Sequence, residues 1–132
     1  MSMNDFDIVE YLQESIASDE QYLVRLRERL ETVASRYEIT NNKQMWVVKS
    51  DMTSSFAGNV DGDNYALRFD ATDCRVFVSK REAYNLSKSF QEADIKARMV
   101  DYRDAIEAEI KKTQSSIPET KKALLKAMEM AA

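Results

Sequence analysis

The residues whose types and spacing best suit chemistry are two arginines, Arg68 and Arg75, in a stretch where apolar and polar residues alternate. If the chain turns back between Asp70 and Asp73, the two guanidinium groups lie opposite each other on the face away from the core. Such a pair can clamp a phosphate, a carboxylate or an acidic partner surface, and Phe77 adds stacking area. The alternative is that the two aspartates neutralise the arginines at the surface for little net energy.

Basic residues continue after the arginines, and residues 80–98 carry a local excess of positive charge. The candidate binding residues are therefore basic or aromatic: Arg68, Arg75, Phe77, Lys80 and Arg81. The acids interleaved in this stretch also fit an ordinary solvated helix face. Because the whole chain has a net charge of -4, we expect no general binding of nucleic acid, which depends on a basic surface.

The sequence lacks the residues from which several kinds of catalytic site and metal site are built. The sequence lacks histidine, the usual general base and metal ligand, and Cys74 is the only cysteine. Residues 61–64 (Asp-Gly-Asp-Asn) have the composition of a calcium loop, but Thr72 stands where an EF-hand needs an acid, so a hairpin turn is favoured. No glycine-rich phosphate loop or nucleophile elbow is present. We expect no enzyme, no metal site and no cofactor.

The elements that must position these residues follow from hydrophobic periodicity. Apolar residues recur every three or four positions from Val9 to Tyr37, with Asp19 among them, which predicts a helix over residues 6–38 with a heptad seam. After residue 43 the period changes to two, which predicts a three- or four-stranded antiparallel β meander. Its expected strands span residues 44–50, 54–58, 64–70 and 74–79.

The remaining chain is predicted to be helical. Ser79 to Glu82 forms a Ser-x-x-Glu capping box, so a helix is expected over residues 80–115, bent or broken near residues 91–95. A second capping box, Ser116 to Glu119, predicts a short helix over residues 117–131. Residues 1–21 carry six acids and no base, whereas the C-terminal stretch is rich in lysine. Antiparallel packing of the long helices is therefore expected.

These predictions combine into an α+β fold in a single domain of residues 1–132. A long N-terminal helix leads into a small antiparallel meander, and a long C-terminal helix then packs antiparallel on the first. This layout resembles that of prefoldin subunits. Two paired helices cover only part of each apolar stripe, so the remainder of the seam favours a homo-oligomer.

The expected function is binding rather than chemistry. The longest apolar run is far shorter than the ~20 residues that a membrane span requires, and no signal-peptide pattern is present, which predicts a cytoplasmic protein without a membrane anchor. We expect a non-enzymatic protein-interaction module, such as a small inhibitor or adaptor; a phage or mobile-element accessory protein acting on a host factor is one example. The alternatives are a binder of a small anionic metabolite or nucleotide, and a holdase-like chaperone.

Overall fold

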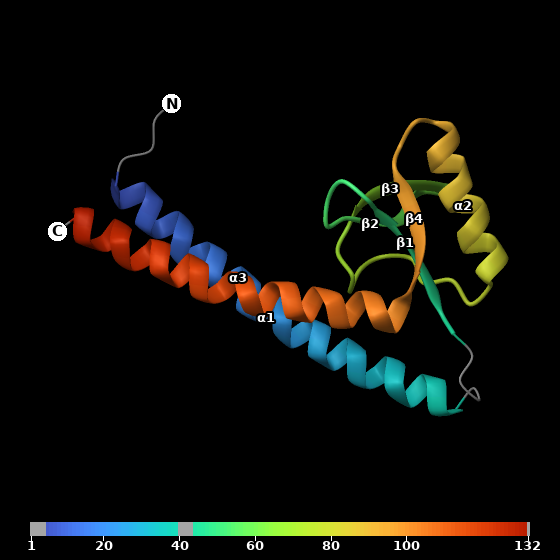
Figure 1. The fold of residues 1–132 in the computed structure, drawn as a ribbon, viewed down its shortest axis with the longest axis horizontal. Helices are drawn as coiled ribbons and strands as arrows, with labels where there is room; N and C mark the ends of the chain where they lie inside the picture. The colour runs from blue at the N-terminus through green and yellow to red at the C-terminus, as the bar shows by residue number, and fades with distance from the viewer. Residues whose placement is uncertain (1–4, 40–43, 132) are drawn as a thin grey trace. The chain divides into compact units, whose positions relative to one another are not determined.

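The computed structural model describes residues 5–39 and 44–131. A long N-terminal helix is followed by a four-stranded antiparallel sheet and then by a long C-terminal helix that packs on the first (Figure 1). The predicted α+β fold class is therefore confirmed. The chain divides into two compact units, described separately below. We call residues 28–108 the sheet unit, and the described parts of residues 1–27 and 109–132 the hairpin unit.

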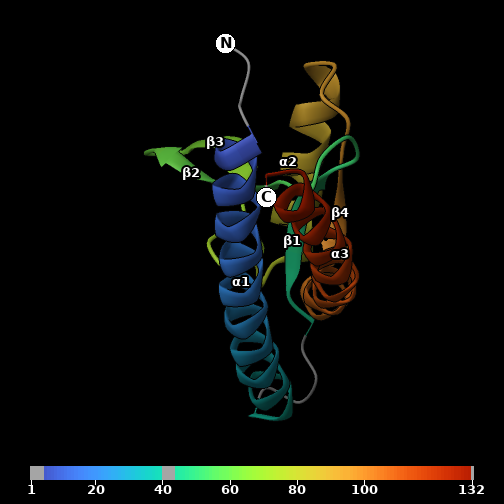
Figure 2. The ribbon, with the colours of Figure 1, turned by 90° about the vertical axis from the view of Figure 1, so that its left-hand side faces the viewer.

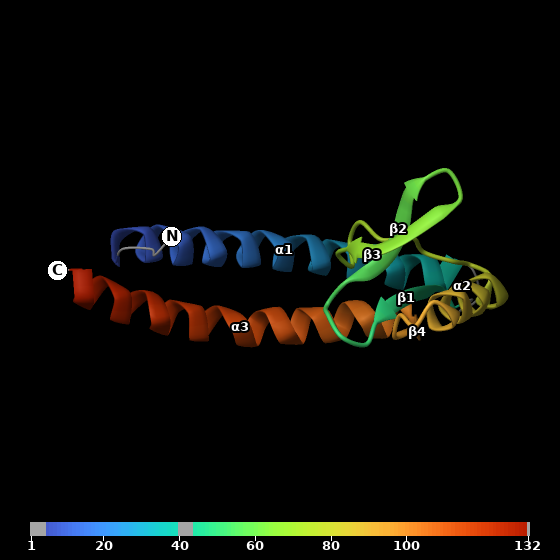
Figure 3. The same cartoon turned by 90° about the horizontal axis from the view of Figure 1, so that it is seen from above.

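The hairpin unit is built from parts of α1 (Asp5–Ile39) and α3 (Tyr102–Ala131). Tyr22 donates a hydrogen bond of 3.1 Å to Glu109, and Lys121 Nζ lies 3.5 Å from a carboxylate oxygen of Glu20. The earlier residue of α1, Glu20, is therefore paired with the later residue of α3, Lys121. The two helices are thus antiparallel (Figures 2 and 3). The acidic start of one helix lies beside the lysine-rich end of the other, as the charge pattern predicts.

The heptad seam of α1 is observed from Val9 to Val33 and supplies much of the helix's buried surface. Leu23, Leu26 and Val33 are buried, and Asp19 is half-buried rather than fully exposed. The side chain of Tyr37, the last residue of the predicted seam, lies outside the described part of the chain. No helix among residues 5–39 and 44–131 is both long and apolar enough to cross a membrane.

The predicted helix break at residue 116 is wrong, because α3 continues through Pro118. Proline removes one backbone hydrogen bond from a helix interior and crowds the preceding turn. Around it Ile117, Thr120 and Leu124 are half-buried on one side of the helix, so packing holds the helix together across the proline. The hydroxyl of Thr120 also donates 3.0 Å to the carbonyl of Ser116, within the same turn.

The sheet has the strand order β3-β2-β1-β4. Its strands are β1 (Trp46–Ser50), β2 (Phe56–Asp61), β3 (Asn64–Phe69) and β4 (Ala97–Asp101). β1 pairs with β4 over its full length, from Trp46↔Asp101 to Ser50↔Ala97, but with β2 only at Lys49↔Phe56. Because Lys49↔Phe56 is their single pair, β1 and β2 diverge beyond it. Strands β1, β2 and β3 match three of the strands predicted from sequence.

The fourth strand is not the predicted one. Residues 74–79 form no strand, and β4 instead lies within residues 80–115, where a helix was expected. Helix α2 (Lys80–Glu92) begins at the predicted cap, with Ser79 Oγ accepting a bond of 3.3 Å from the backbone of Glu82. It ends near the predicted bend or break at residues 91–95, where Asp94 adopts a left-handed conformation with φ 62°. The chain is thereby released to enter β4.

Two glycines in this unit have different roles. Gly62 has φ 54° and lies in the β2–β3 turn, which confirms the predicted hairpin turn. Gly58 lies inside β2. A Cβ atom on Gly58 would lie 2.5 Å from Cδ2 of Phe69, so glycine is required here to make room for a ring.

Helix α2 covers one face of the sheet and closes a hydrophobic core there (Figure 1). Ala83 of α2 packs with Val48 of β1, Ala57 of β2, Ala97 of β4 and Phe77, all of them buried. Half-buried side chains surround this cluster: Trp46, Tyr65, Leu67, Leu86, Phe90 and Met99. The small alanines let the helix approach the sheet closely, while the aromatic side chains fill its border.

Candidate functional site

The segment of residues 75–77 lies between β1 and β2 where these strands diverge. The backbone NH of Arg75 donates 2.9 Å to the carbonyl of Ala57 in β2. On the other side, Phe77 and Trp46 of β1 exchange two backbone hydrogen bonds of 2.7 and 2.8 Å. The segment is therefore hydrogen-bonded on both sides. Two of the predicted binding residues, Arg75 and Phe77, are thereby fixed to the sheet.

The predicted pairing of Arg68 with Arg75 is wrong, because β2 lies between β3 and the segment of Arg75. The reason is the turn after β3. The carbonyl of Asp70 accepts bonds from the NH groups of Asp73 and Cys74, at 3.2 and 3.0 Å, so the chain winds into a helical turn. It therefore leaves β3 instead of pairing back on it.

Contacts from the helical segments of the sheet unit hold this turn in place. Arg29 of α1 donates 3.0 Å to the carbonyl of Thr72, and Tyr102 of α3 donates 3.1 Å to the carbonyl of Ala71. The carboxylate of Asp70 accepts from the backbone and hydroxyl of Thr72, at 2.8 and 2.6 Å. Asp70 thus organises a turn.

Two cations lie over the aromatic rings beside this segment. Lys80 Nζ is 5.0 Å from the ring centre of Trp46, and Arg75 Cζ is 5.7 Å from that of Phe77. The rings of Tyr65 and Phe77 are also neighbours, with centres 6.0 Å apart. We call Trp46, Tyr65, Arg75, Phe77 and Lys80 the cation-aromatic surface. It combines the exposed charges of Arg75 and Lys80 with the half-buried rings of Trp46 and Tyr65, and the buried ring of Phe77 supports them from the core.

The other two predicted binding residues do not join this surface in the contacts observed. Arg68 is exposed on β3, where its guanidinium carbon lies 5.7 Å from the ring centre of Phe69. Arg81 is exposed in the first turn of α2. Val78 is an apolar neighbour that sequence reasoning did not select, and 72% of its surface is exposed.

Sequence reasoning also did not assign Trp46 and Tyr65 to the site. Trp46 is half-buried. Its ring touches the core cluster and also lies beneath Lys80. The available signal was the single tryptophan at the start of a predicted strand, but its pairing with residue 77 depends on a long-range contact.

The Cys74 thiol and the Tyr102 hydroxyl, which lie near this turn, are not activated as nucleophiles. Burial raises the pKa of the Cys74 thiol to about 12, and the nearby carboxylate of Asp70 acts in the same direction. Burial likewise raises the pKa of Tyr102 to about 12. Both groups are therefore protonated near neutral pH, and the thiolate that would act as a nucleophile is scarce. Within the described ranges, no three acidic, cysteine or histidine side chains gather as a metal site.

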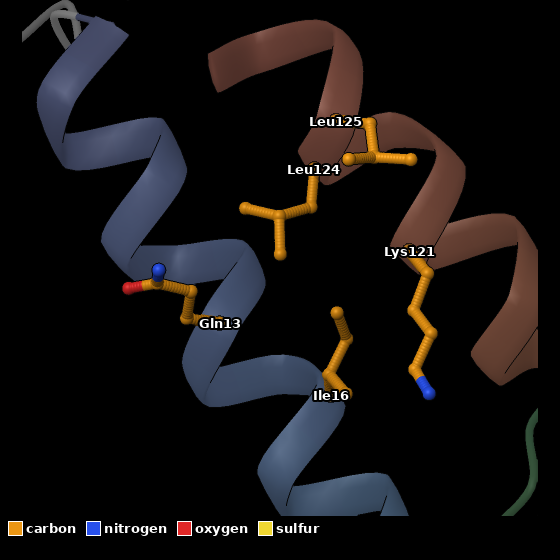
Figure 4. Close-up of a pocket in the computed structure, with 5 residues that line it drawn as sticks. All are labelled: Gln13, Ile16, Lys121, Leu124 and Leu125. Carbon is orange, nitrogen blue, oxygen red and sulfur yellow. The ribbon is translucent and has the colours of Figure 1, made fainter.

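A second candidate site is an apolar groove of about 380 Å³ in the hairpin unit (Figure 4). Gln13 and Ile16 line it from α1, and Lys121, Leu124 and Leu125 line it from α3. Figure 4 shows Leu124 and Ile16 extending into the space between the helices. The exposed remainder of the seam was anticipated from sequence, but the groove was not, because its walls come from two distant segments.

Comparison with known proteins identified no relative of this chain. No protein-family model, curated protein or solved structure matches the chain. Functional inference therefore rests on the two surfaces themselves: one cationic and aromatic in the sheet unit, the other apolar in the hairpin unit.

Proposed function

We propose that this protein is a non-enzymatic protein-interaction module that binds an acidic surface of a partner protein. The observation that carries the proposal is the pair of exposed cations over aromatic rings, Lys80 over Trp46 and Arg75 over Phe77. Tryptophan, tyrosine and arginine are the residues most enriched at the energetic centres of protein interfaces. This surface holds all three residue types next to one another.

The rigidity of the surface supports this function. Phe77 and Trp46 are tied together by two backbone hydrogen bonds, and the NH of Arg75 is bonded to β2. A binding surface whose rings are already fixed loses little conformational freedom when a partner arrives. The cations lie on long side chains, but the rings beneath them restrict where the charges can lie. Little of the free energy gained from contacts with the partner would therefore be lost in ordering these side chains.

The charge distribution also favours an acidic partner. Between residues 75 and 98 the chain carries six basic and three acidic side chains, although the whole chain has a net charge of -4. A positive region on an acidic protein steers association toward negatively charged surfaces. Partner recognition should consequently weaken as salt is added.

The geometry favours a protein surface over a small anion. Small anions are usually held by several donors that converge in a concave site. Arg68, the second arginine of the predicted clamp, is separated from Arg75 by β2. The observed surface instead offers cations side by side with ring area, which suits an extended partner.

Affinity capture with charge-reversed variants tests the proposal. The immobilised protein is compared with Arg75→Glu and Lys80→Glu, and with Lys112→Glu as a matched control on an exposed residue of the hairpin unit. We expect a specific partner retained by the wild type and by Lys112→Glu, with at least tenfold weaker binding to the two site variants. Equal capture by all four proteins, with folding verified by circular dichroism, would refute the assignment of the surface.

Thermal shift with nucleotides tests the alternative of a small anionic ligand. A ligand present at one hundred times its dissociation constant stabilises a protein by about 2.7 kcal/mol. We expect no shift with mono-, di- or triphosphate nucleotides. A shift that disappears in Arg75→Glu would instead assign the surface to a small anion.

A further inference from the structure

The apolar groove of the hairpin unit continues into an exposed apolar stripe on α3. Leu124 is half-buried against α1, but Leu125 is 63% exposed and Met128 is 46% exposed. Positions 121, 125 and 128 share a face because they are four and three residues apart. Two helices thus bury one side of α3 and leave the neighbouring side, with its leucine and methionine, uncovered. Contiguous apolar surface of this kind marks an interaction site.

The charges that flank this stripe have opposite signs on the two helices. Residues 1–21 carry six acids and no base, whereas α3 presents Lys121, Lys122 and Lys126 near the groove. Lys121 is close to Glu20 of the same chain, at 3.5 Å. No described residue forms an ion pair with Lys122 or Lys126, and both are exposed. The apolar groove is therefore flanked by an acid-rich segment of α1, which we call the acidic wall, and by a lysine-rich segment of α3, which we call the basic wall.

We propose that the groove binds a second copy of this chain, through a two-fold axis parallel to the hairpin helices. The two hairpin units form an antiparallel four-helix bundle, in which α1 of each copy contacts α3 of the other. Leu125 and Met128 of each copy lie against the groove of its partner. The stripe that the chain leaves uncovered then becomes the core of the bundle.

The charge pattern selects this axis over the alternative. When two helical hairpins pack face to face, a two-fold axis parallel to the helices places each α1 over the other copy's α3. An axis perpendicular to the helices instead places α1 over α1 and α3 over α3. The first arrangement sets acids against lysines, whereas the second sets like charges against each other.

The ion pair of the hairpin also fixes which charges meet. Glu20 and Lys121 lie at the same level of the hairpin, and Glu14 and Lys126 lie about one and a half turns further toward its free end. An axis parallel to the helices preserves these levels between copies. Glu14 of one copy is therefore level with Lys126 of the other, and the pair can form across the interface.

Size measurement on the full chain tests whether the dimer forms. We expect a dimer in sedimentation equilibrium at a protein concentration of about 100 µM. Leu125→Glu and Met128→Glu should each raise the dissociation constant at least tenfold, because they place a charge in the bundle core. Met52→Glu is the matched control, since Met52 is an exposed methionine of the sheet unit. A monomeric wild type overturns the proposal, as does dissociation by Met52→Glu equal to that by Met128→Glu.

Charge reversal tests the arrangement of the walls. Lys126→Glu should weaken the dimer severalfold, and adding Glu14→Lys should restore it, because the exchanged pair is again complementary. If the double variant dissociates further than Lys126→Glu alone, these two walls do not meet and the proposed axis is wrong.

Spin-label distances test the direction of the axis. Single labels are placed at Glu10→Cys or Gln21→Cys in a Cys74→Ser background, since Glu10 and Gln21 are exposed on α1. An axis parallel to the helices gives similar distances between equivalent labels at the two positions. A perpendicular axis makes the distance grow by about 3 Å for each residue between the label and the axis level, so with a third label at Glu14→Cys, also exposed, the three distances cannot all be similar. Failure of this proposal leaves the cation-aromatic surface untouched, since that surface belongs to the sheet unit.

Discussion

The two units of this protein bury their apolar residues in different ways. In the sheet unit Val47, Val48, Phe56 and Ile106 are fully buried, and residues distant in sequence surround them. The outer part of the hairpin unit has two helices only, and there Ile16 and Leu124 are no more than half-buried. A sheet covered by a helix closes its own core, whereas two helices leave part of each stripe open. Stability should therefore depend mainly on the sheet unit.

The largest expected effect on stability comes from a substitution in the core of the sheet unit. Phe56→Ala should lower the free energy of unfolding by about 3–5 kcal/mol, because it removes a fully buried ring and leaves a cavity. Leu125→Ala, in the exposed stripe of the hairpin unit, should change it by less than about 0.5 kcal/mol in the monomer. Urea unfolding of both variants at low protein concentration measures the difference. Equal losses would mean that the hairpin core matters as much as the sheet core.

Alkaline pH should destabilise the sheet unit through Tyr102 and Cys74. Both groups are neutral when protonated, and burial raises each pKa to about 12, from ordinary values of 10.0 and 9.0. Their stabilising contribution is complete below the ordinary pKa values and is lost as the pH rises from about 9 to about 12. Each group that titrates adds a slope of about 1.4 kcal/mol per pH unit.

Unfolding measured by circular dichroism between pH 8 and pH 12 checks this dependence. Tyr102→Phe should cost about 1 kcal/mol near neutral pH, because the hydrogen bond to Ala71 is lost, and should flatten the alkaline loss. The same slope in the wild type and in Tyr102→Phe would show that other groups cause the alkaline transition.

A smaller effect is expected where two strands leave no room for a side chain. Gly58→Ala should destabilise by about 1–3 kcal/mol, because the new methyl group would overlap the ring of Phe69. If the overlap is the cause, Phe69→Leu combined with Gly58→Ala should recover part of the loss. A cost that is unchanged in this background would point to backbone strain instead. Thermal unfolding of the two variants and of Phe69→Leu alone gives the comparison.

Features set by neighbouring residues were predictable from sequence. The α1 seam, the Ser79 cap of α2 and the turn at Gly62 depend on spacings of a few residues, and each was found as expected. Strand β4 was missed because its five residues show little alternation by themselves and are fixed by pairing with β1. Pro118 was misinterpreted for a similar reason, since packing outweighed a local capping signal.

The candidate site divides in the same way. Sequence reasoning selected Arg75, Phe77 and Lys80 for their charge and ring area, and their role in binding stays a prediction. Their arrangement was not predicted, because it depends on a turn held by Arg29 and Tyr102 from distant helices. Periodicity gives the face on which a residue lies, but it cannot show which strand becomes its neighbour.

The smallest expected effect concerns the ion pair of the hairpin unit. Glu20 and Lys121 are both more than half exposed, so solvent and salt screen their attraction. A double-mutant cycle with Glu20→Gln and Lys121→Met in the monomer should give a coupling of about 0.2–1 kcal/mol that vanishes in 1 M salt. A salt-independent coupling would mean that the pair is shielded from water. The groove beside it would then be closed within the monomer, and its uncovered stripe would no longer require a partner.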